Sequence, residues 1–421
     1  MKLLRRAKEI LDQHISKSTG HLNHLTPYHL IGLARIDWDY AANQIREVFA
    51  GQWKNGLIPS LIFGKKSNSQ DFLVGDFWKT AACKNAPEEV FTSGISQAPT
   101  FGFVLMKMYE LAENKEKALS FLKEMYPKIH AFHSYLYTFR DLAEEGLVAV
   151  IHPTESGTEG SPLWDAVLDK IPLDSNTETT EGKGRPHDFA RMLQLTTILQ
   201  ECNFEESQIA IKHPIRVQDP FFNAILSFSN EAMIEIGRVI KEDVTDFVLW
   251  NELTVFSMNE KLWDEEQGIY NAYDMVNEAF IPGDTLSGLL PIVADVPNID
   301  QAENILRNIK DEFFSGTTKN PMYLCPTYDV TSENINLGER QRGAVSISQN
   351  WLLYQGLKRF EMNAVAQKVK NDSLELMEKY GFCEFFNPAK NGLVKSDNET
   401  NFYNNISCAA VCLDFLLEEN H

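Results

Sequence analysis

The sequence predicts a single all-α domain that spans residues 1–421. Apolar residues recur at steps of three and four along most of the chain, which is the period of an amphipathic helix. The stretch after Asp219-Pro220 shows this most clearly, with Phe222, Ile225, Phe228, Ala232, Ile236 and Ile240. Alternating strands are few, with one short candidate over 57–63, and no shift in composition marks a domain boundary.

The periodicity also predicts where the helices lie. They are expected at approximately 2–17, 27–50, 97–113, 115–140, 185–202, 244–261, 300–312 and 362–380, and in the apolar stretches that start at Phe222, Ile347 and Ile406. Between them lie long loops at 51–95, 141–184, 264–285, 313–345 and 381–404. Long loops in a compact domain are usually functional or disordered. This alternation fits a toroid of helical hairpins with a site built from loops at one end, although periodicity alone establishes only the all-α class.

Size and charge exclude several classes of function. The chain is 43% apolar, enough for a large core, and its formal charge of −20 comes from 59 acidic and 39 basic residues. That charge argues against nucleic acid or an anionic membrane as a partner. The N-terminus lacks the apolar run of a signal peptide, and no stretch is long enough to span a bilayer. The six scattered cysteines form no CxxC pair, which indicates a reducing, cytoplasmic location.

The segment 152–165 is the most distinctive stretch of the chain. Its sequence, HPTESGTEGSPLWD, holds three carboxylates and a tryptophan. Gly157, Gly160 and Pro162 interrupt any helix on both sides of Glu159, so the segment is expected to be a loop that presents a carboxylate. Carboxylates beside an aromatic ring suit work on a sugar, and a solvated acidic loop is the plainer alternative.

A series of further motifs runs in order along most of the chain. They are FAGQWKNGLIP at 49–59, TSGISQAP at 92–99, DPFFNAIL at 219–226, LSGLLP at 286–291, and RGAV with NWLL between 342 and 353. Together with 152–165 they resemble the (α/α)6-barrel glycoside hydrolases of family 63. The resemblance is closest to the mannosylglycerate and glucosylglycerate hydrolases and more distant to the trehalases. It implies the helical barrel, hydrolysis of an α-linked glucose or mannose with inversion, and no organic cofactor.

The resemblance also implies a pair of catalytic carboxyl groups. In inverting enzymes the general acid and the general base stand roughly 6.5–9.5 Å apart. Glu159 occupies the position of the family's general-acid Asp and is longer by one methylene. Two residues are candidates for the base: Glu384, in the segment EFFNP, and Glu399, six residues before Asn405. The position shortly before the last helix favours Glu399 as base and Glu384 as a sugar-pocket residue, with an exposed loop acid as the alternative for Glu399.

Other motif residues are expected to bind or orient the substrate. These candidates are Glu155, Trp164, Asp165, Glu384, Gln97, Trp53 and Arg342. Capping of local turns is an equal alternative for Glu155 and Asp165, and burial in the core is an alternative for the tryptophans. Lys183 or Arg185 is a weaker candidate for meeting an anionic aglycone. The histidines share no metal-ligand spacing, so no metal site is expected.

The chain departs from the family pattern where the family lines its sugar pocket. The family's aromatic QWxWD is replaced by HLNHL at 21–25, and a Trp before ESG is replaced by Thr154. Ser346 replaces another Trp, Ser348 stands where Asn is usual, and the FSWTAA helix start reads NISCAA from Asn405. The scaffold motifs are kept, so the pattern indicates a preserved fold with a rebuilt sugar pocket.

The predicted function is therefore an inverting α-glycosidase that acts on a small α-glucoside or α-mannoside, such as a glycosylglycerate or a disaccharide. The alternative is a carbohydrate-binding or regulatory protein that uses the same barrel without turnover. A different reaction, such as sugar epimerisation, lacks a persuasive histidine pair. A small carbohydrate is the expected partner, and the sequence leaves the oligomeric state open.

Overall fold

The computed structural model describes residues 2–17, 28–63, 75–173, 185–389 and 405–418. The longer α-helices are α1 (Lys2–Lys17), α2 (Tyr28–Ala34), α3 (Trp38–Ala50), α5 (Phe101–Leu111), α6 (Lys115–Phe139), α8 (Asp188–Glu201), α9 (Glu206–Lys212), α10 (Pro220–Ile240), α11 (Thr245–Ser257), α12 (Ile299–Lys310), α14 (Ile347–Arg359), α15 (Asn363–Tyr380) and α16 (Ile406–Leu417). Single turns form α4 (Gly75–Trp78), α7 (Asp165–Leu168) and α13 (Glu312–Ser315). Tighter turns form η1 (Thr80–Ala82), η2 (Pro153–Glu155), η3 (Pro162–Trp164), η5 (Leu286–Gly288) and η6 (Leu290–Ala294), and η4 (Met258–Leu262) is a π-turn that extends α11.

The strands are short and lie in the connections between helices. They are β1 (Ile62–Phe63), β2 (Phe91–Thr92), β3 (Val217–Gln218), β4 (Trp263–Asp264), β5 (Ile269–Tyr270), β6 (Ala272–Asp274), β7 (Ala279–Ile281), β8 (Val345–Ser346) and β9 (Phe385–Phe386). They pair antiparallel as β1 with β2, β4 with β5, β8 with β9, and β3-β6-β7. None is long enough to organise the core, so the helices determine the architecture.

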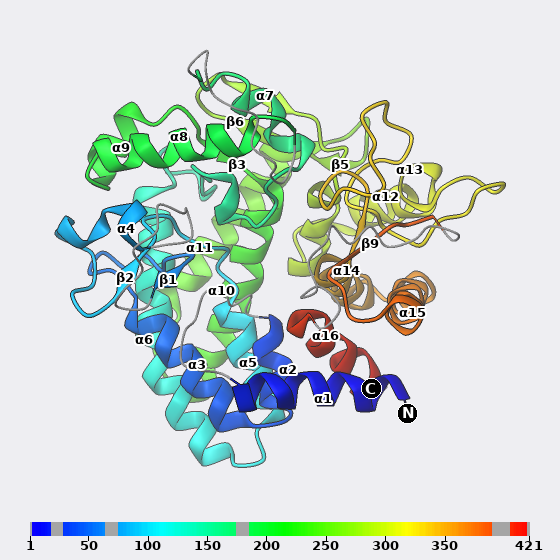
Figure 1. The fold of residues 1–421 in the computed structure, drawn as a ribbon, viewed down its shortest axis with the longest axis horizontal. Coiled ribbons are helices and arrows are strands. Elements are labelled where there is room, and N and C mark those ends of the chain that lie inside the picture. The colour runs from blue at the N-terminus through cyan, green and yellow to red at the C-terminus, as the bar shows by residue number, and fades with distance from the viewer. Residues whose placement is uncertain (1, 18–27, 64–74, 174–184, 390–404, 419–421) are drawn as a thin grey trace.

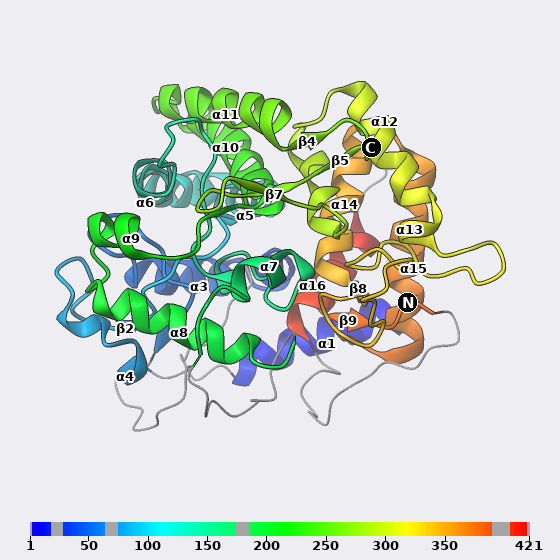
Figure 2. The ribbon, with the colours of Figure 1, turned by 90° about the horizontal axis from the view of Figure 1, so that it is seen from above.

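Six apolar segments close into an inner ring. Each contacts the next in the order α2, α5, α10, η6, α14 and α16, and α16 returns to α2. Their side chains are largely buried. Five further helices lie outside this ring: α1 packs on α16, α3 on α2, α6 on α5, α11 on α10 and α15 on α14. Figure 2 shows α11 and α15 on the outer side of their inner partners.

The ring closes through close helix contacts that require glycine. A Cβ placed on Gly32 of α2 would lie 2.4 Å from the Cβ of Ala410 in α16, and one on Gly356 of α14 would lie 2.6 Å from Ile292 in η6. Only a residue without a side chain permits these approaches. Where the ring closes, the first and last helices, α1 and α16, lie side by side (Figure 1).

Local chemistry explains where the helices differ from the predicted bounds. The helix expected at 27–50 is two helices, because the chain turns after Ala34 and Asp37 caps α3 by accepting a hydrogen bond from the Tyr40 N–H at 2.9 Å. The helix expected from residue 97 starts at Phe101, since Pro99 disfavours helical conformation before it. The strand expected over 57–63 is confined to β1. Within the described ranges, no helix has the length and apolar character needed to cross a bilayer.

Candidate active site

A cavity of about 360 Å³ lies at the end of the ring where the inner helices begin. Tyr28 is the first residue of α2, Phe221 the second of α10, Ser348 the second of α14, and Ser407 the second of α16, and all four line the cavity. The N-terminal ends of helices carry partial positive charge and unpaired N–H groups. This end of the barrel therefore favours carboxylates and other anionic groups.

The loop 152–165 carries Glu159 to this cavity. Gly157 and Gly160 on either side of the Thr158-Glu159 pair have φ values of +70° and +88°, in the left-handed region that favours glycine. Before them, η2 is closed by a capping box between His152 and Glu155. Glu159 is partly buried and lines the cavity. The loop therefore presents a carboxylate, as its turn-forming residues predict.

Glu155 is buried under the loop and fixes its path. Its Oε1 accepts hydrogen bonds from the N–H and the hydroxyl of Ser96, both at 3.0 Å. Its Oε2 accepts from the N–H groups of Ile151 and His152, at 2.9 and 3.3 Å. Burial by itself raises the pKa of Glu155, but the Arg140 guanidinium at 3.7 Å and these N–H donors outweigh burial and lower it. Glu155 is therefore held as an anion and is a poor proton donor.

Trp53 and Trp164, which are expected to form the floor of the sugar site, do not line the cavity. Trp164 is fully buried, and its indole N–H donates to the Thr158 hydroxyl at 3.0 Å. Trp53 is only 3% exposed, and its indole N–H donates to Thr92 at 2.9 Å. Neither ring is among the residues that line the cavity. The expectation of stacking on sugar is corrected for both: these rings pack in the core, and Trp164 supports the turn that carries Glu159.

Asp165 and Arg342 form an ion pair beside the cavity, and neither residue lines it. Asp165 accepts a hydrogen bond from Arg342 and lies 3.1 Å from the Nε of Arg185. Arg185 also pairs with Asp169 at 2.9 Å. The charge of Arg185 is thus neutralised by the loop, so it is not available to an anionic aglycone. Lys183, the other cation considered for that role, lies outside the described residues.

Glu384 stands in the wall of the cavity, where β9 begins. Its Oε1 accepts from the Ser346 hydroxyl at 2.9 Å and from the Ser348 N–H at 3.0 Å. Its Oε2 accepts from the Ser348 hydroxyl at 2.9 Å. Burial raises the pKa of Glu384, and these hydrogen bonds together with the charge of Arg340 only partly oppose the rise. Glu384 is therefore a more basic carboxylate than an exposed glutamate.

The hydroxyl groups of Ser346 and Ser348 both donate to Glu384. The sequence analysis, which notes these serines only as departures from larger residues in the family pattern, does not predict this role. Gln97 also lines the cavity and is held by a hydrogen bond from its side-chain amide to the Pro59 carbonyl at 3.1 Å.

Further lining residues were missed by sequence reasoning. Arg340 and Tyr28 both face the cavity. Arg340 is two residues before the Arg342-Gly343 motif, and that proximity was the available signal for it. Glu399 and the segment 21–25 lie outside the described residues.

Comparison with known proteins identifies the family and the fold. The model of a family described as the mannosylglycerate hydrolase MGH1-like glycoside hydrolase domain matches residues 23–402. Mannosylglycerate hydrolase from Thermus thermophilus is 30% identical over 369 residues, which cover 85% of this chain and 86% of that protein. Glucosylglycerate hydrolase from Mycolicibacterium hassiacum is 26% identical over 379 residues, covering 85% of this chain and 84% of the relative.

Solved structures show the same fold. The GH63 mannosylglycerate hydrolase of a Thermus thermophilus strain, in complex with Tris and D-glycerate, has a TM-score of 0.85 with 28% identity, and covers 99% of this chain and 100% of that one. Neutral trehalase from Saccharomyces cerevisiae has a TM-score of 0.55 with 11% identity, over 94% of this chain and 70% of that one, and shows the fold alone. The predicted barrel is confirmed. The chain belongs to the mannosylglycerate hydrolase MGH1-like family of glycoside hydrolases and has the (α/α)6-barrel fold.

Proposed function

We propose that this protein hydrolyses a small α-mannoside or α-glucoside of glycerate, with inversion at the anomeric carbon. Glu159 acts as the general acid and Glu384 as the general base. The observation that carries the proposal is that one cavity brings these two carboxyl groups together at the N-terminal end of the barrel. The reactions named for its relatives, hydrolysis of mannosylglycerate and of glucosylglycerate, give the substrate class.

The surroundings of Glu384 suit a general base. A base must be ionised to take a proton from water, and three hydrogen-bond donors hold its carboxylate in one orientation. Burial makes that carboxylate more basic than usual, which strengthens proton abstraction. Glu399 was favoured by sequence position and remains the competing candidate, and the two assignments are separable by mutation.

Glu159 suits the general acid because it is presented by a turn with glycine on both sides of the Thr158-Glu159 pair. Glycine allows the backbone to place the longer Glu side chain where the family has Asp. Glu155, in the same loop, is excluded from this role by its lowered pKa and its four hydrogen-bond donors.

In the proposed reaction the glycosidic oxygen takes the proton of Glu159 as its bond to the anomeric carbon breaks. Glu384 removes a proton from the water that attacks this carbon from the opposite face. The products are free glycerate and a sugar with the β configuration at its anomeric carbon. Glu159 regains a proton from solvent and Glu384 loses one, which restores the starting state.

Arg340 is the proposed partner of the glycerate carboxylate. It lines the cavity, and the positive ends of several inner helices open onto the same space. Both features favour an anionic aglycone over a neutral one. The predicted consequence is a preference for glycosylglycerates over disaccharides with the same sugar.

The proposal is tested by incubating the protein with mannosylglycerate, glucosylglycerate and trehalose, and by following the anomeric protons by NMR. Release of the β-anomer from a glycosylglycerate, with loss of activity in Glu159→Gln, is the expected result. Release of the α-anomer would contradict inversion. Binding without any hydrolysis would favour the carbohydrate-binding alternative.

A further inference from the structure

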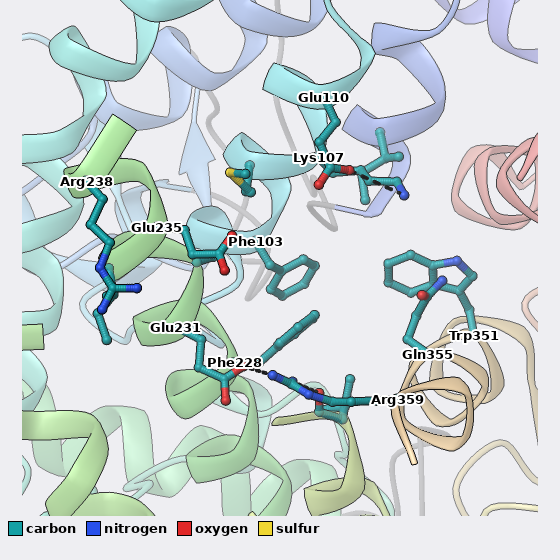
Figure 3. A pocket seen from close by; sticks show the side chains of 15 residues that line it. Phe103, Lys107, Glu110, Phe228, Glu231, Glu235, Arg238, Trp351, Gln355 and Arg359 are labelled. Carbon is teal, nitrogen blue, oxygen red and sulfur yellow. Dashed lines mark hydrogen bonds and ion pairs between the residues drawn. The ribbon is translucent and has the colours of Figure 1, made fainter. Parts of the chain in front are cut away.

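A second cavity lies at the opposite end of the barrel. Its volume is about 570 Å³, and it is lined mainly by residues of α5, α10 and α14, with one residue each from α2 and η6. Figure 3 shows the side chains that line it. It shares no lining residue with the active-site cavity. The rings of Phe103 and Trp351 lie on its floor, with centroids 6.1 and 5.9 Å from the ring of Tyr28, which lines the active site. An aromatic wall thus separates the two cavities.

The floor of this second cavity is aromatic. Phe103 and Phe228 are stacked with centroids 4.8 Å apart, and Trp351 lies 6.5 Å from Phe103. Figure 3 shows these rings around an open space. Phe228 is only half-buried, so part of its surface is available for contact. Aromatic floors with a few polar groups are typical of small-molecule sites, and their apolar faces suit the C–H face of a sugar ring.

Paired charges at the rim make the site nearly neutral. Arg359 donates to Glu231 at 2.8 Å, and Lys107 lies 3.7 Å from Glu110. Each cation has a carboxylate beside it, so these four residues give the cavity little net attraction for either a cation or an anion. The rim therefore favours a ligand without net charge.

Three polar side chains at the mouth of the same cavity have no partner within the described part of the chain: no hydrogen bond or ion pair joins Glu235, Arg238 or Gln355 to another group. Glu235 and Arg238 are exposed to solvent and Gln355 is partly buried. A carboxylate, a guanidinium and a carboxamide together supply acceptors and donors for several hydroxyl groups. We propose that this cavity is a second sugar-binding site, which takes a neutral hexose on its aromatic floor. It is independent of the hydrolytic reaction proposed for the opposite cavity.

The test uses the full chain labelled with ¹⁵N in its seven tryptophans. D-mannose or D-glucose is titrated while the indole N–H signal of Trp351 is followed, with Trp351→Phe used only to assign that signal. The signal is expected to shift in a saturable manner. In the double variant Glu235→Gln, Arg238→Ala the concentration for half-saturation should rise about tenfold, since hydrogen bonds to charged groups are lost. Hydrolysis should be unchanged in that variant.

Two further variants keep the test decisive. Ala232 lines the cavity, so the added ring of Ala232→Phe should obstruct the space over the aromatic floor and abolish the shift, even if the double variant does not fold. The matched control is Glu303→Gln, Arg307→Ala, an exposed acid–base pair on the outer helix α12, and it should titrate like the wild type. No shift in the wild type would overturn the proposal. So would a shift that both cavity variants leave unchanged, because the sugar would then be acting from the active site.

Discussion

Replacing Ser348 with alanine is expected to raise the pKa of Glu384, so that activity appears only at a higher pH. The Ser348 hydroxyl donates to Oε2 of Glu384 at 2.9 Å, and no other donor within the described residues reaches that oxygen. The backbone N–H of Ser348 donates to Oε1 at 3.0 Å and is retained in the alanine variant. The substitution therefore removes one donor to the carboxylate and leaves the others in place.

The size of this effect follows from the hydrogen bond that is lost. A hydrogen bond to a charged group contributes about 1.5–3 kcal/mol, and one pKa unit corresponds to about 1.4 kcal/mol. Water in the open cavity replaces part of the lost interaction, so a rise of about one unit is expected. The hydroxyl stabilises the ionised form, and a general base works only when ionised. The acidic limb of kcat/KM should thus move up by about one pH unit, with little change on the alkaline side.

The assay is kcat/KM for a glycosylglycerate as a function of pH. Ser348→Thr retains a hydroxyl and should keep the wild-type limb. Ser60→Ala is the matched control, since Ser60 lines the same cavity but pairs with Ser93 at 2.9 Å. An unchanged limb in Ser348→Ala, or an equal shift in Ser60→Ala, would refute the reasoning that Glu384 is the base and that Ser348 tunes it.

Three further substitutions test the stability of the site. Arg140→Met leaves the buried Glu155 carboxylate without its cation, and the free energy of unfolding in urea should fall by about 3–5 kcal/mol; a loss under about 1 kcal/mol would count against a paired buried charge. Burial raises the pKa of Asp219 to about 7, so its contribution to stability is full at low pH and is lost as pH rises through about 7. The free energy of unfolding of Asp219→Asn relative to wild type should therefore increase as the pH rises from about 4 to about 8. A difference in free energy of unfolding that does not change with pH would contradict this. Thr158→Val removes the acceptor of the Trp164 indole and should cost about 1–3 kcal/mol, whereas Thr158→Ser should not.

Much of the fold could be predicted from local patterns. The period of apolar residues located the long helices, and the turn formers around Glu159 predicted its loop. The periodicity does not predict the break between α2 and α3, because the break depends on a single capping residue, Asp37, inside a stretch whose helical period continues on both sides. The closure of the ring depends on contacts between residues far apart in sequence, such as Gly32 with Ala410.

The site was predicted less completely for a related reason. Motif positions predicted Glu159 as the acid, Glu399 as the base and Glu384 as a pocket residue; Glu159 and Glu384 line the cavity, and Glu399 lies outside the described residues. Motifs do not show which way an aromatic ring faces. Trp53 and Trp164 are buried, with their indole groups bonded to threonines. The presence of Ser346 where the family pattern has a Trp predicts a loss from the sugar pocket, although in the structure the Ser346 hydroxyl donates to Glu384. Such compensation becomes visible only when the three-dimensional neighbours are known.

The central claim is that Glu159 and Glu384 form the catalytic pair. The most direct test compares Glu384→Gln with Glu399→Gln in hydrolysis of mannosylglycerate, after both variants are shown to be folded by circular dichroism. The account predicts a loss of about 10²–10⁴ in kcat for Glu384→Gln and near-wild-type activity for Glu399→Gln. An active Glu384→Gln beside an inactive Glu399→Gln would contradict it and would assign the base to Glu399.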